Sequence, residues 1–409
     1  MVAVVLALVG FGQTASGESS SRHHGHVRLG PHPTVNSSDG LRGPSLSSAT
    51  GRSSLAGPSL SAATRLDDVS WQVAPGITFS QWTQVDPQGP TRIFLLTARL
   101  DQPGLVLDQV SGSTVSARAP LSQWLRDDGA VAGVNADFFD IGDTGAPLGV
   151  GADRQRRTLH APRSGWNTSF VIDAAGVPKI VQDTLVAKAV RSGLPTIGVT
   201  NFNSPTVAPG GVGDYTSAWG RASGRRITDT ATAVREVNVR NGVVASNRTT
   251  LTSGPVISGD LLVGRGAGAT ALRSLKLGQR VQVQRSLSVP AEVAVSGSVQ
   301  LLHNGQTTTT DNNELHPRTA IGIDGDQRLL HLVVADGRSE SSGGETLLQL
   351  AQLLQSLGDE EGLNLDGGGS STMVAEDPAG TLAVRNVPSD GSERPVPNGL
   401  GFRYTPPPG

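Results

Sequence analysis

Residues suited to chemistry are concentrated in the stretch from Leu363 to Met373, which reads Leu-Asn-Leu-Asp-Gly-Gly-Gly-Ser-Ser-Thr-Met. Its first residues alternate between apolar and polar, as in a strand, and this pattern ends at Asp366. Three glycines follow, and a run of glycines permits backbone conformations in which several amide groups point at one anion. The stretch therefore predicts a carboxylate beside a phosphate-binding loop. The donors of that loop are Gly367, Gly368, Gly369, Ser370, Ser371 and Thr372. A tight glycine-rich turn that starts a helix is the alternative.

Two further aspartates follow apolar runs. The run 131–135 ends with Asn135 and continues into Asp137 and two phenylalanines, while the run 329–335 continues into Asp336. Polar side chains at a strand end beside aromatic residues are typical of a pocket wall, although both aspartates also fit simple turns. The sequence thus predicts three carboxylates at strand ends, near one glycine-rich loop.

A helix is expected between the last two of these strands. Residues 344–357 carry apolar side chains at the i, i+3, i+4 and i+7 spacing, and Gly358 is a good C-terminal stop. If the strands on either side are parallel neighbours, Asp336 and Asp366 lie at corresponding strand ends. Arg318 stands just before the preceding strand, 320–323, where it is available to an anion or to a structural ion pair.

The rest of the folded part is expected to be rich in strands. Residues 166–300 show many short strand patterns separated by turn residues, and Asn241-Gly242 is a strong hairpin signal. The glycines in 264–268 lack the Lys-Ser/Thr of a nucleotide loop and a convincing following helix, so a turn is expected there. The predicted fold class is α/β (α+β), with a mixed, largely antiparallel β-sheet core, flanking helices, and a β-rich N-terminal and middle part.

Composition excludes several classes of protein. The chain has 409 residues, a net charge of −2 and no cysteine, so disulfides and thiolate metal sites are excluded. The chain has no excess of basic residues, so its composition gives no indication of a nucleic-acid partner. His23, His24 and His26 have the residue type of a metal site, but a solvated cluster in a polar tail is the better interpretation.

The N-terminal residues indicate export. Residues 2–11 form an apolar run too short to span a bilayer, and small residues suited to signal-peptidase cleavage follow at 14–17. No Lys or Arg precedes that run, so the signal segment, 1–17, is atypical or truncated. Residues 18–68 are rich in Ser, Gly and Pro and predict a disordered spacer. The folded unit is expected at 69–405, β-rich up to 300 and motif-rich from 301. No later span is expected, which favours a secreted or cell-surface protein.

Several motifs in order resemble the phosphodiester glycosidase family. The similarity runs from about Gly133 to Phe402, with a weaker part back to Trp71. The blocks that carry it are 133–139, 294–298, 301–305, 317–322, 334–338, 342–347, 364–372 and 394–398. The chain departs from the family pattern at Ala136, which stands in place of a glycine, and at Ser296 and Ser298, which interrupt a glycine-rich block. These departures bear on substrate identity more than on fold.

The resemblance implies an exported hydrolase that cleaves the C1–O bond of a sugar-1-phosphodiester in glycans or cell-surface polymers. Asp137, Asp336 and Asp366 would then supply the base or nucleophile, with their ranking left open. Arg318 and Thr319 and the glycine-rich loop would hold the phosphate, and Asn135 would orient a sugar hydroxyl or cap its loop. No cofactor is required, although Ca²⁺ or Mg²⁺ would suit these oxygen ligands. Two alternatives remain: a non-catalytic binder of phosphorylated surface polysaccharide, and a phosphomonoesterase.

Overall fold

The computed structural model describes residues 64–408. The expected signal segment, the tail histidines and most of the expected spacer lie outside this range. The first strand begins at Thr64, five residues before the expected start of the folded part. None of the helices within 64–408 has the length and apolar character that crossing a membrane requires.

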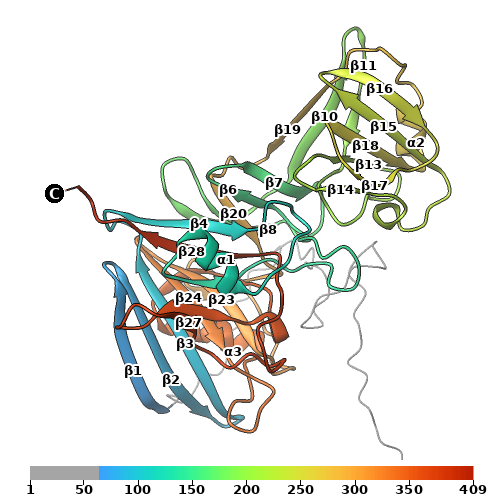
Figure 1. Ribbon diagram of the computed structural model, residues 1–409. Coiled ribbons are helices and arrows are strands. Elements are labelled where there is room, and N and C mark those ends of the chain that lie inside the picture. Colours follow the sequence, from blue (N-terminus) through green and yellow to red (C-terminus); the bar gives the residue numbers. More distant parts are fainter. Residues whose placement is uncertain (1–63, 409) are drawn as a thin grey trace, which may run out of the picture.

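An eight-stranded sheet forms the base of the molecule (Figure 1). Its order is β1-β2-β3-β24-β23-β25-β21-β22, and every neighbouring pair is antiparallel. The strands are β1 (Thr64–Ala74), β2 (Ile77–Asp86), β3 (Gly89–Arg99), β21 (Val299–His303), β22 (Gln306–Thr307), β23 (Arg318–Asp324), β24 (Leu329–Ala335) and β25 (Asp359–Asn364).

A five-stranded sheet packs face to face on the first. Its order is β27-β26-β5-β28-β4. These strands are β4 (Leu105–Ser111), β5 (Ala132–Asn135), β26 (Met373–Glu376), β27 (Leu382–Val384) and β28 (Asn398–Tyr404). The shared core joins Phe94, Ile321 and Leu363 of one sheet to Val134 and Phe402 of the other. These two sheets therefore form a closed β-sandwich.

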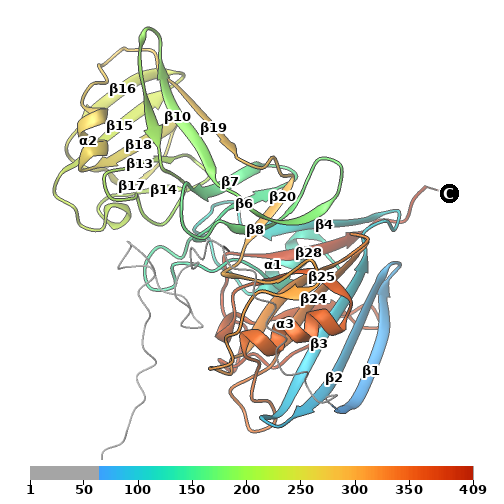
Figure 2. The ribbon, with the colours of Figure 1, turned by 180° about the vertical axis from the view of Figure 1, so that it is seen from behind.

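One helix covers each outer face of this sandwich. Helix α3 (Leu347–Ser356) lies against the eight-stranded sheet, as Figure 2 shows. Its Leu350 and Leu354 side chains pack on that sheet. A capping box between Thr346 and Gln349 fixes its start. Helix α1 (Leu121–Asp128) covers the other sheet through two buried leucines. Both faces of the central strands are thus buried, which explains why their sequences are continuously apolar rather than alternating.

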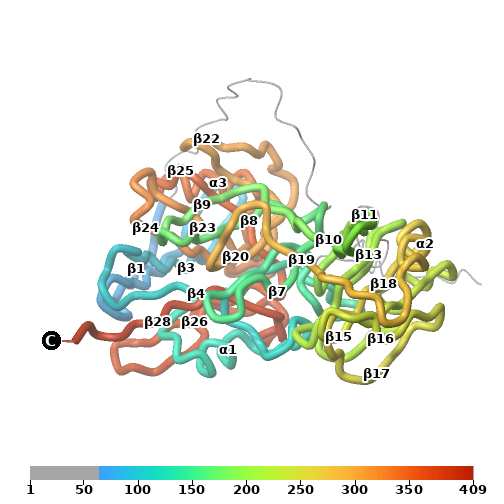
Figure 3. The backbone as a smooth tube through the Cα atoms, turned by 90° about the horizontal axis from the view of Figure 1, so that it is seen from above, coloured from blue at the N-terminus to red at the C-terminus, as the bar shows by residue number. Residues whose placement is uncertain are grey.

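A second β-rich lobe is built from residues between β5 and β21 (Figure 3). Its ten-stranded sheet has the order β16-β15-β18-β13-β12-β7-β6-β20-β8-β9, and β8 and β20 contribute to the core of the sandwich. The strands are β6 (Gly151–Asp153), β7 (Arg157–Pro162), β8 (Thr168–Ile172), β9 (Pro178–Gln182), β12 (Asn201–Phe202), β13 (Val212–Tyr215), β15 (Val234–Arg240), β16 (Val243–Arg248), β18 (Asp260–Arg265) and β20 (Val293–Ser296).

Smaller elements complete this lobe. A three-stranded sheet and a two-stranded sheet flank the long one, together with α2 (Ala267–Leu272) and the 3₁₀ turn η1 (Arg226–Thr228). The remaining strands of the lobe are β10 (Leu185–Arg191), β11 (Leu194–Val199), β14 (Arg221–Ser223), β17 (Ser253–Val256) and β19 (Gln282–Leu287). A second 3₁₀ turn, η2 (Gly368–Ser370), lies in the glycine-rich loop that follows β25.

The predicted largely antiparallel core is confirmed, but the α/β class is wrong, because the fold is mainly β with few flanking helices. Continuously apolar strands around one clear helix resemble a parallel β–α–β unit, whereas here a second sheet rather than a helix layer buries one face. The predicted hairpin at Asn241 is confirmed between β15 and β16. A helix does follow the glycines at 264–268, since α2 begins at Ala267.

The connection from β24 through α3 to β25 also differs from expectation. Because β23 is antiparallel to both strands, β24 and β25 run in the same direction, but β23 lies between them. The strands are therefore not parallel neighbours. Asp336 and Asp366 still leave the sheet at the same edge, on either side of Arg318 and Pro317.

Candidate active site

Asn135 connects the strand ends of the two packed sheets. Its Nδ2 atom donates to the carbonyl of Asp366 at 2.6 Å. Its Oδ1 atom accepts from the hydroxyl of Thr319 at 2.8 Å and from the amide of Thr372 at 3.0 Å. All four residues are buried. Asn135 and Thr319 thus hold the end of β5, the start of β23 and the glycine-rich loop together.

The Asp137 carboxylate lies beside this junction and is buried. Its Oδ1 accepts from the Ser296 amide at 2.5 Å, and its Oδ2 accepts from Nδ2 of Asn398 at 2.7 Å. Burial is the main reason that the pKa of Asp137 is raised to about 7. The two hydrogen bonds lower this pKa, whereas the charge of Asp366 raises it. Asp137 therefore exchanges its proton near neutral pH.

Asp366 lies next to Asp137 in space, although 229 positions separate them in the numbering. Its amide donates to the carbonyl of Ala136 at 2.9 Å, so the backbones of the two segments touch. The electrostatic effect of Asp366 on the pKa of Asp137 has the same origin. The structure thus brings two of the three predicted catalytic carboxylates into one electrostatically coupled pair.

Asp336 faces a different part of the same edge. Its Oδ1 accepts from Nδ2 of Asn386 at 3.1 Å and from the amide of Val387 at 3.0 Å. Burial raises the pKa of Asp336, and the hydrogen bond from Asn386 lowers it. Asn386 also donates to the carbonyl of Ser371 at 3.0 Å. In this structure Asp336 holds the segment after β27 against the glycine-rich loop.

The glycine-rich loop is buried, and several of its amides bind protein carbonyls. The amide of Gly368 donates to Pro317 at 2.8 Å, and those of Ser370 and Ser371 donate back into the loop at 3.2 Å. Gly368 has a φ of 62°, which favours glycine. The predicted convergence of these amides on an anion is therefore not present in this conformation. Ser370 and Gly369 instead face the side chain of Arg394.

Arg394 lies directly over the loop. A Cβ atom added to Gly369 would stand 2.1 Å from Nη2 of Arg394. Nη1 of Arg394 lies 3.4 Å from Oγ of Ser370, and Asp390 pairs with the guanidinium at 2.7 Å. The Arg394 side chain is 17% exposed, so this cation is accessible to solvent. Only glycine, which has no Cβ atom, leaves room at position 369 for the Arg394 side chain.

Arg318 is buried at the same edge, next to the residue whose carbonyl holds Gly368. Its Nε donates to the carbonyl of Glu345 at 3.0 Å, and its Nη2 to that of Glu314 at 3.2 Å. Burial raises the pKa of Glu345 to about 8, whereas Arg318 lowers it. Two donors of Arg318 are therefore committed to backbone carbonyls here.

A histidine that no sequence pattern marks as functional lies close to Asp137. His160 in β7 is buried, and its Nε2 is 3.6 Å from Oδ2 of Asp137. Its Nδ1 is 2.8 Å from the carbonyl of Gly149, which can only accept, so Nδ1 carries the hydrogen. Burial lowers the pKa of His160 to about 4. The ring is therefore neutral at pH 7, and the contact with Asp137 is not an ion pair.

The sequence missed four residues of this site as functional candidates: Asn386, His160, Arg394 and Asn398. The last two belong to a block, 394–398, whose pattern resembles the family's closing block. The serines that interrupt the glycine-rich block are also explained. Oγ of Ser296 bonds the backbone of Val150, and Oγ of Ser298 accepts from Asn364 at 2.9 Å.

Carboxylate and imidazole groups are not gathered for a metal in the part of the chain that the structure describes. Within 64–408, no group of three or more His, Cys, Asp or Glu side chains has an arrangement that could hold a metal ion.

Comparison with known proteins relates part of this site to a family. A family model described as phosphodiester glycosidase matches residues 232–403. Residues 232–403 belong to the phosphodiester glycosidase family. The matched region contains Arg318, Asp336, Asp366, Arg394 and Asn398. Asn135, Asp137 and His160 precede the phosphodiester glycosidase match, and the fold brings them to it.

One curated relative and three solved structures are also similar. A Bacillus subtilis (strain 168) protein, the SPbeta prophage-derived uncharacterized protein YomE, is 40% identical over 98 residues. That stretch covers 24% of this chain but only 14% of the relative. The chain thus matches a small part of that protein.

Among solved structures, a hypothetical protein from Synechocystis has a TM-score of 0.70 at 22% identity, covering 83% of this chain and 64% of that one. A presumed exported protein from Burkholderia pseudomallei K96243 has a TM-score of 0.68 at 19% identity, covering 85% and 98%. These two show that the fold extends well beyond the phosphodiester glycosidase match. The catalytic domain of zebrafish N-acetylglucosamine-1-phosphodiester alpha-N-acetylglucosaminidase is matched at 16% identity with a TM-score of 0.40, over 84% and 89%.

Proposed function

We propose that this chain is a hydrolase that cleaves the C1–O bond of a sugar-1-phosphodiester, acting outside the cytoplasm on a glycan or cell-surface polymer. The observation that carries the proposal is the coupled pair of Asp137 and Asp366 beside the arginine-covered glycine-rich loop. The family match over 232–403 supports this reaction class. The apolar N-terminal run supports export, and the fold shared with a presumed exported protein is consistent with it.

The proposed chemistry assigns the proton transfer to Asp137. A phosphodiester is already a good leaving group, so the step that needs help is activation of the incoming water rather than protonation of the leaving oxygen. With a pKa raised to about 7, Asp137 is a stronger base than an ordinary carboxylate and is ionised above neutral pH. Asp137 would take the water proton while the C1–O bond breaks. Asp366 would stabilise the positive charge that develops at the sugar.

The leaving phosphate would be received at the glycine-rich loop. Arg394 lies over Gly369, within reach of Ser370, and is a partly exposed cation at this edge. The phosphate would replace Asp390 on its guanidinium, because both groups offer two oxygens to the planar fork. Arg318 would add positive charge from below, next to Pro317. Asn135 and Thr319 would hold these parts in register.

The decisive experiment is product analysis in ¹⁸O-labelled water with an α-N-acetylglucosamine-1-phosphodiester and a panel of related sugar-1-phosphodiesters, with and without EDTA. Cleavage of the C1–O bond puts the label in the free sugar and releases an unlabelled phosphomonoester. Label in the phosphate, or release of sugar-1-phosphate, would contradict the proposal in favour of P–O cleavage. No turnover across the panel would favour a non-catalytic binder.

The phosphate assignment has its own test. Replacing Arg394 with alanine is expected to lower turnover by roughly 10²–10³-fold, as expected for loss of one preorganised charge on a departing oxyanion. Arg385→Ala is the matched control, because Arg385 lies on the same segment but binds the carbonyl of Ala375. Equal activity of the two variants would contradict the role of Arg394.

A further inference from the structure

A small pocket is lined by two residues that contact Asp137, His160 and Asn398. It has room for about one water-sized group. Residues of β4, β7, β28 and the loop of the second lobe line it, among them Gln109, Arg156, His160, Ala218 and Asn398. A space of this size admits a single hydroxyl group rather than a whole ring. Asn398 lines the pocket and also holds Asp137.

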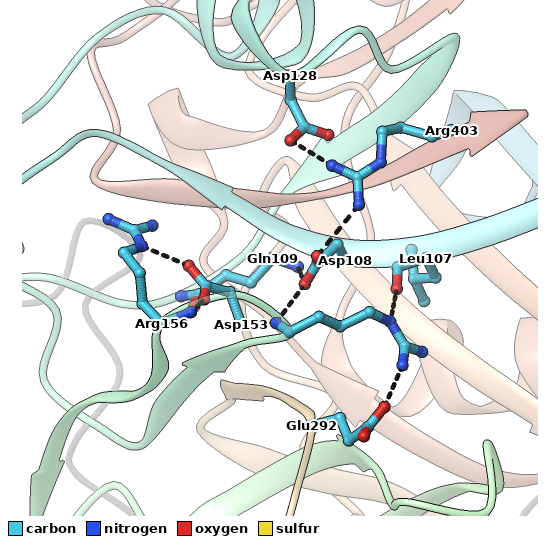
Figure 4. A network of polar contacts seen from close by, with 9 residues as sticks. Leu107, Asp108, Gln109, Asp128, Asp153, Arg156, Glu292 and Arg403 are labelled. Atoms are coloured by element: carbon cyan, nitrogen blue, oxygen red, sulfur yellow. Dashed lines mark hydrogen bonds and ion pairs between the residues drawn. The ribbon is translucent and has the colours of Figure 1, made fainter.

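Gln109 gives this pocket an unusual property. Its side chain is buried, with 4% exposure, yet neither its Oε1 nor its Nε2 has a hydrogen-bond partner among the described residues. Buried amides are nearly always paired, because an unpaired buried donor or acceptor has lost its hydrogen bonds to water without replacing them. Figure 4 shows Gln109 between Asp108 and the Arg156–Asp153 pair. Both a donor and an acceptor are thus held at the pocket wall.

His160 adds a second unused atom. With the hydrogen on Nδ1 bound to Gly149, Nε2 presents a lone pair, and it has no hydrogen-bond partner among the described residues. Oδ2 of Asp137 lies 3.6 Å from Nε2 of His160, so two hydrogen-bond acceptors face one another without a direct hydrogen bond. A hydroxyl group, which donates one hydrogen and accepts another, satisfies this arrangement.

The charged groups of the pocket do not favour an anion. Arg156 is the cation in its wall, and its donors bind Oδ2 of Asp153 at 2.6 Å, the carbonyl of Gly112 at 2.6 Å and Oγ of Ser111 at 2.7 Å. Asp137 lies behind the wall and repels anions once ionised. The remaining groups, an amide and a neutral imidazole, are those that bind uncharged hydroxyls.

We propose that the pocket lined by Gln109, His160 and Asn398 binds a hydroxyl group of the sugar whose C1–O bond is broken. The amide of Gln109 and Nε2 of His160 are the hydrogen-bonding groups offered to that hydroxyl. This assignment rests on the proposed function, because it makes the pocket the sugar-binding part of the same site. The phosphate would bind separately, at Arg394.

The test is ligand-observed NMR titration of the full chain with two kinds of probe. Neutral probes are the methyl α-glycosides of glucose, galactose, mannose and N-acetylglucosamine, and the anionic probe is methyl phosphate. At least one glycoside is expected to bind, and Gln109→Leu is expected to weaken it about tenfold or more, the effect of one lost hydrogen bond or more. His160→Leu should weaken the same glycoside. Methyl phosphate binding should not change in either variant.

The matched control is Gln84→Leu, a buried glutamine on strand β2 of the other sheet, which should leave glycoside binding unchanged. Thermal unfolding of each variant identifies any that fails to fold, and His160→Leu then provides the second measurement. Absence of glycoside binding by the unmodified protein, or equal binding by Gln109→Leu, would overturn the proposal. Loss of methyl phosphate instead of glycoside would do the same.

Failure of this pocket and failure of the proposed reaction give different results. Turnover of a phosphodiester without any effect of Gln109→Leu on binding or on KM would overturn the sugar pocket and keep the hydrolase. Glycoside binding that depends on Gln109, in a protein without turnover, would keep the pocket and overturn the hydrolase.

Discussion

Two buried histidine–aspartate pairs in this fold have the same composition and different geometry. In the eight-stranded sheet, Nδ1 of His331 and Oδ1 of Asp359 are 2.8 Å apart, a direct hydrogen bond between β24 and β25. At the candidate site, His160 and Asp137 stand 3.6 Å apart, and each is hydrogen-bonded to other groups. The first pair is joined directly by this hydrogen bond, as a structural pair is. The second leaves a lone pair, a carboxylate and a pocket facing one another, which is what a site for a ligand requires.

The largest contrast is expected in turnover. Asp137→Asn keeps the shape of the side chain but removes the base, so kcat should fall by roughly 10²–10⁴-fold. Asp359→Asn, the equivalent change in the directly hydrogen-bonded pair of His331 and Asp359, should leave kcat unchanged. Initial rates on the phosphodiester that the protein turns over measure both. Similar losses in the two variants would mean that Asp137 acts through stability alone.

Stability should show the reverse order. His331→Leu removes the hydrogen-bond partner of a buried carboxylate and is expected to cost about 1–3 kcal/mol. His160→Leu breaks one bond to the Gly149 carbonyl and should cost about 0.5–1.5 kcal/mol. Urea denaturation of the two variants gives the comparison. A larger loss of stability for His160→Leu than for His331→Leu would show that the pair of His160 and Asp137 contributes more to stability than the pair of His331 and Asp359.

The pH dependence of stability separates the members of the pair of His160 and Asp137. The pKa of Asp137 is raised from its usual 3.8 to about 7, so the folded state binds the extra proton and stability falls as pH rises from 4 to 7. The pKa of His160 is lowered from 6.5 to about 4, so the unfolded state binds the extra proton and stability falls as pH drops from 6.5 to 4. Asp137→Asn should therefore gain stability relative to the unmodified protein as pH rises. His160→Gln should gain it as pH falls. Denaturation curves at pH 4, 5.5 and 7 test both signs, and parallel curves would contradict them.

The smallest effect, and the sharpest for mechanism, is in the pH–rate profile. A base with a pKa near 7 makes kcat/KM rise with pH and level off above about 7. His160→Gln should shift this midpoint by a fraction of a unit, whereas His331→Gln should not move it. A profile that falls through pH 7 would show that Asp137 acts as an acid.

Sequence patterns predicted the parts of the site that sit in local motifs. Asp366 and Asp137 each end an apolar run, and such runs place polar residues at sheet edges in any layered β fold. His160 has no such pattern, because its neighbours in the 157–162 strand give no sign of function. Its position beside Asp137 depends on how the ten-stranded sheet, which contains β7, packs near the end of β5, and this is a property of the tertiary fold.

The fold class was harder to predict for a similar reason. The strands 318–324 and 329–335 are apolar on both faces, and α3 covers only one of these two faces. The sequence around α3 therefore resembles a helix-covered parallel sheet. What covers the second face is the sheet of β5, β26 and β28, whose strands are far apart in sequence and short. Local periodicity carries no information on such pairing.

The bonds that assemble the candidate site join distant parts of the chain, and this has a consequence for synthesis on the ribosome. Asn135 bonds Thr319 and Asp366 across 184 and 231 positions, and Asp137 bonds Asn398 across 261. Strand β28 also fills the gap between β5 and β4. Since translation proceeds at about 5–20 residues per second, Asn398 is made at least ~13 seconds after Asp137. A nascent chain therefore carries Asp137 and Asp366 in an unassembled state until β28 has been made, and the proposed activity would begin only after that strand inserts.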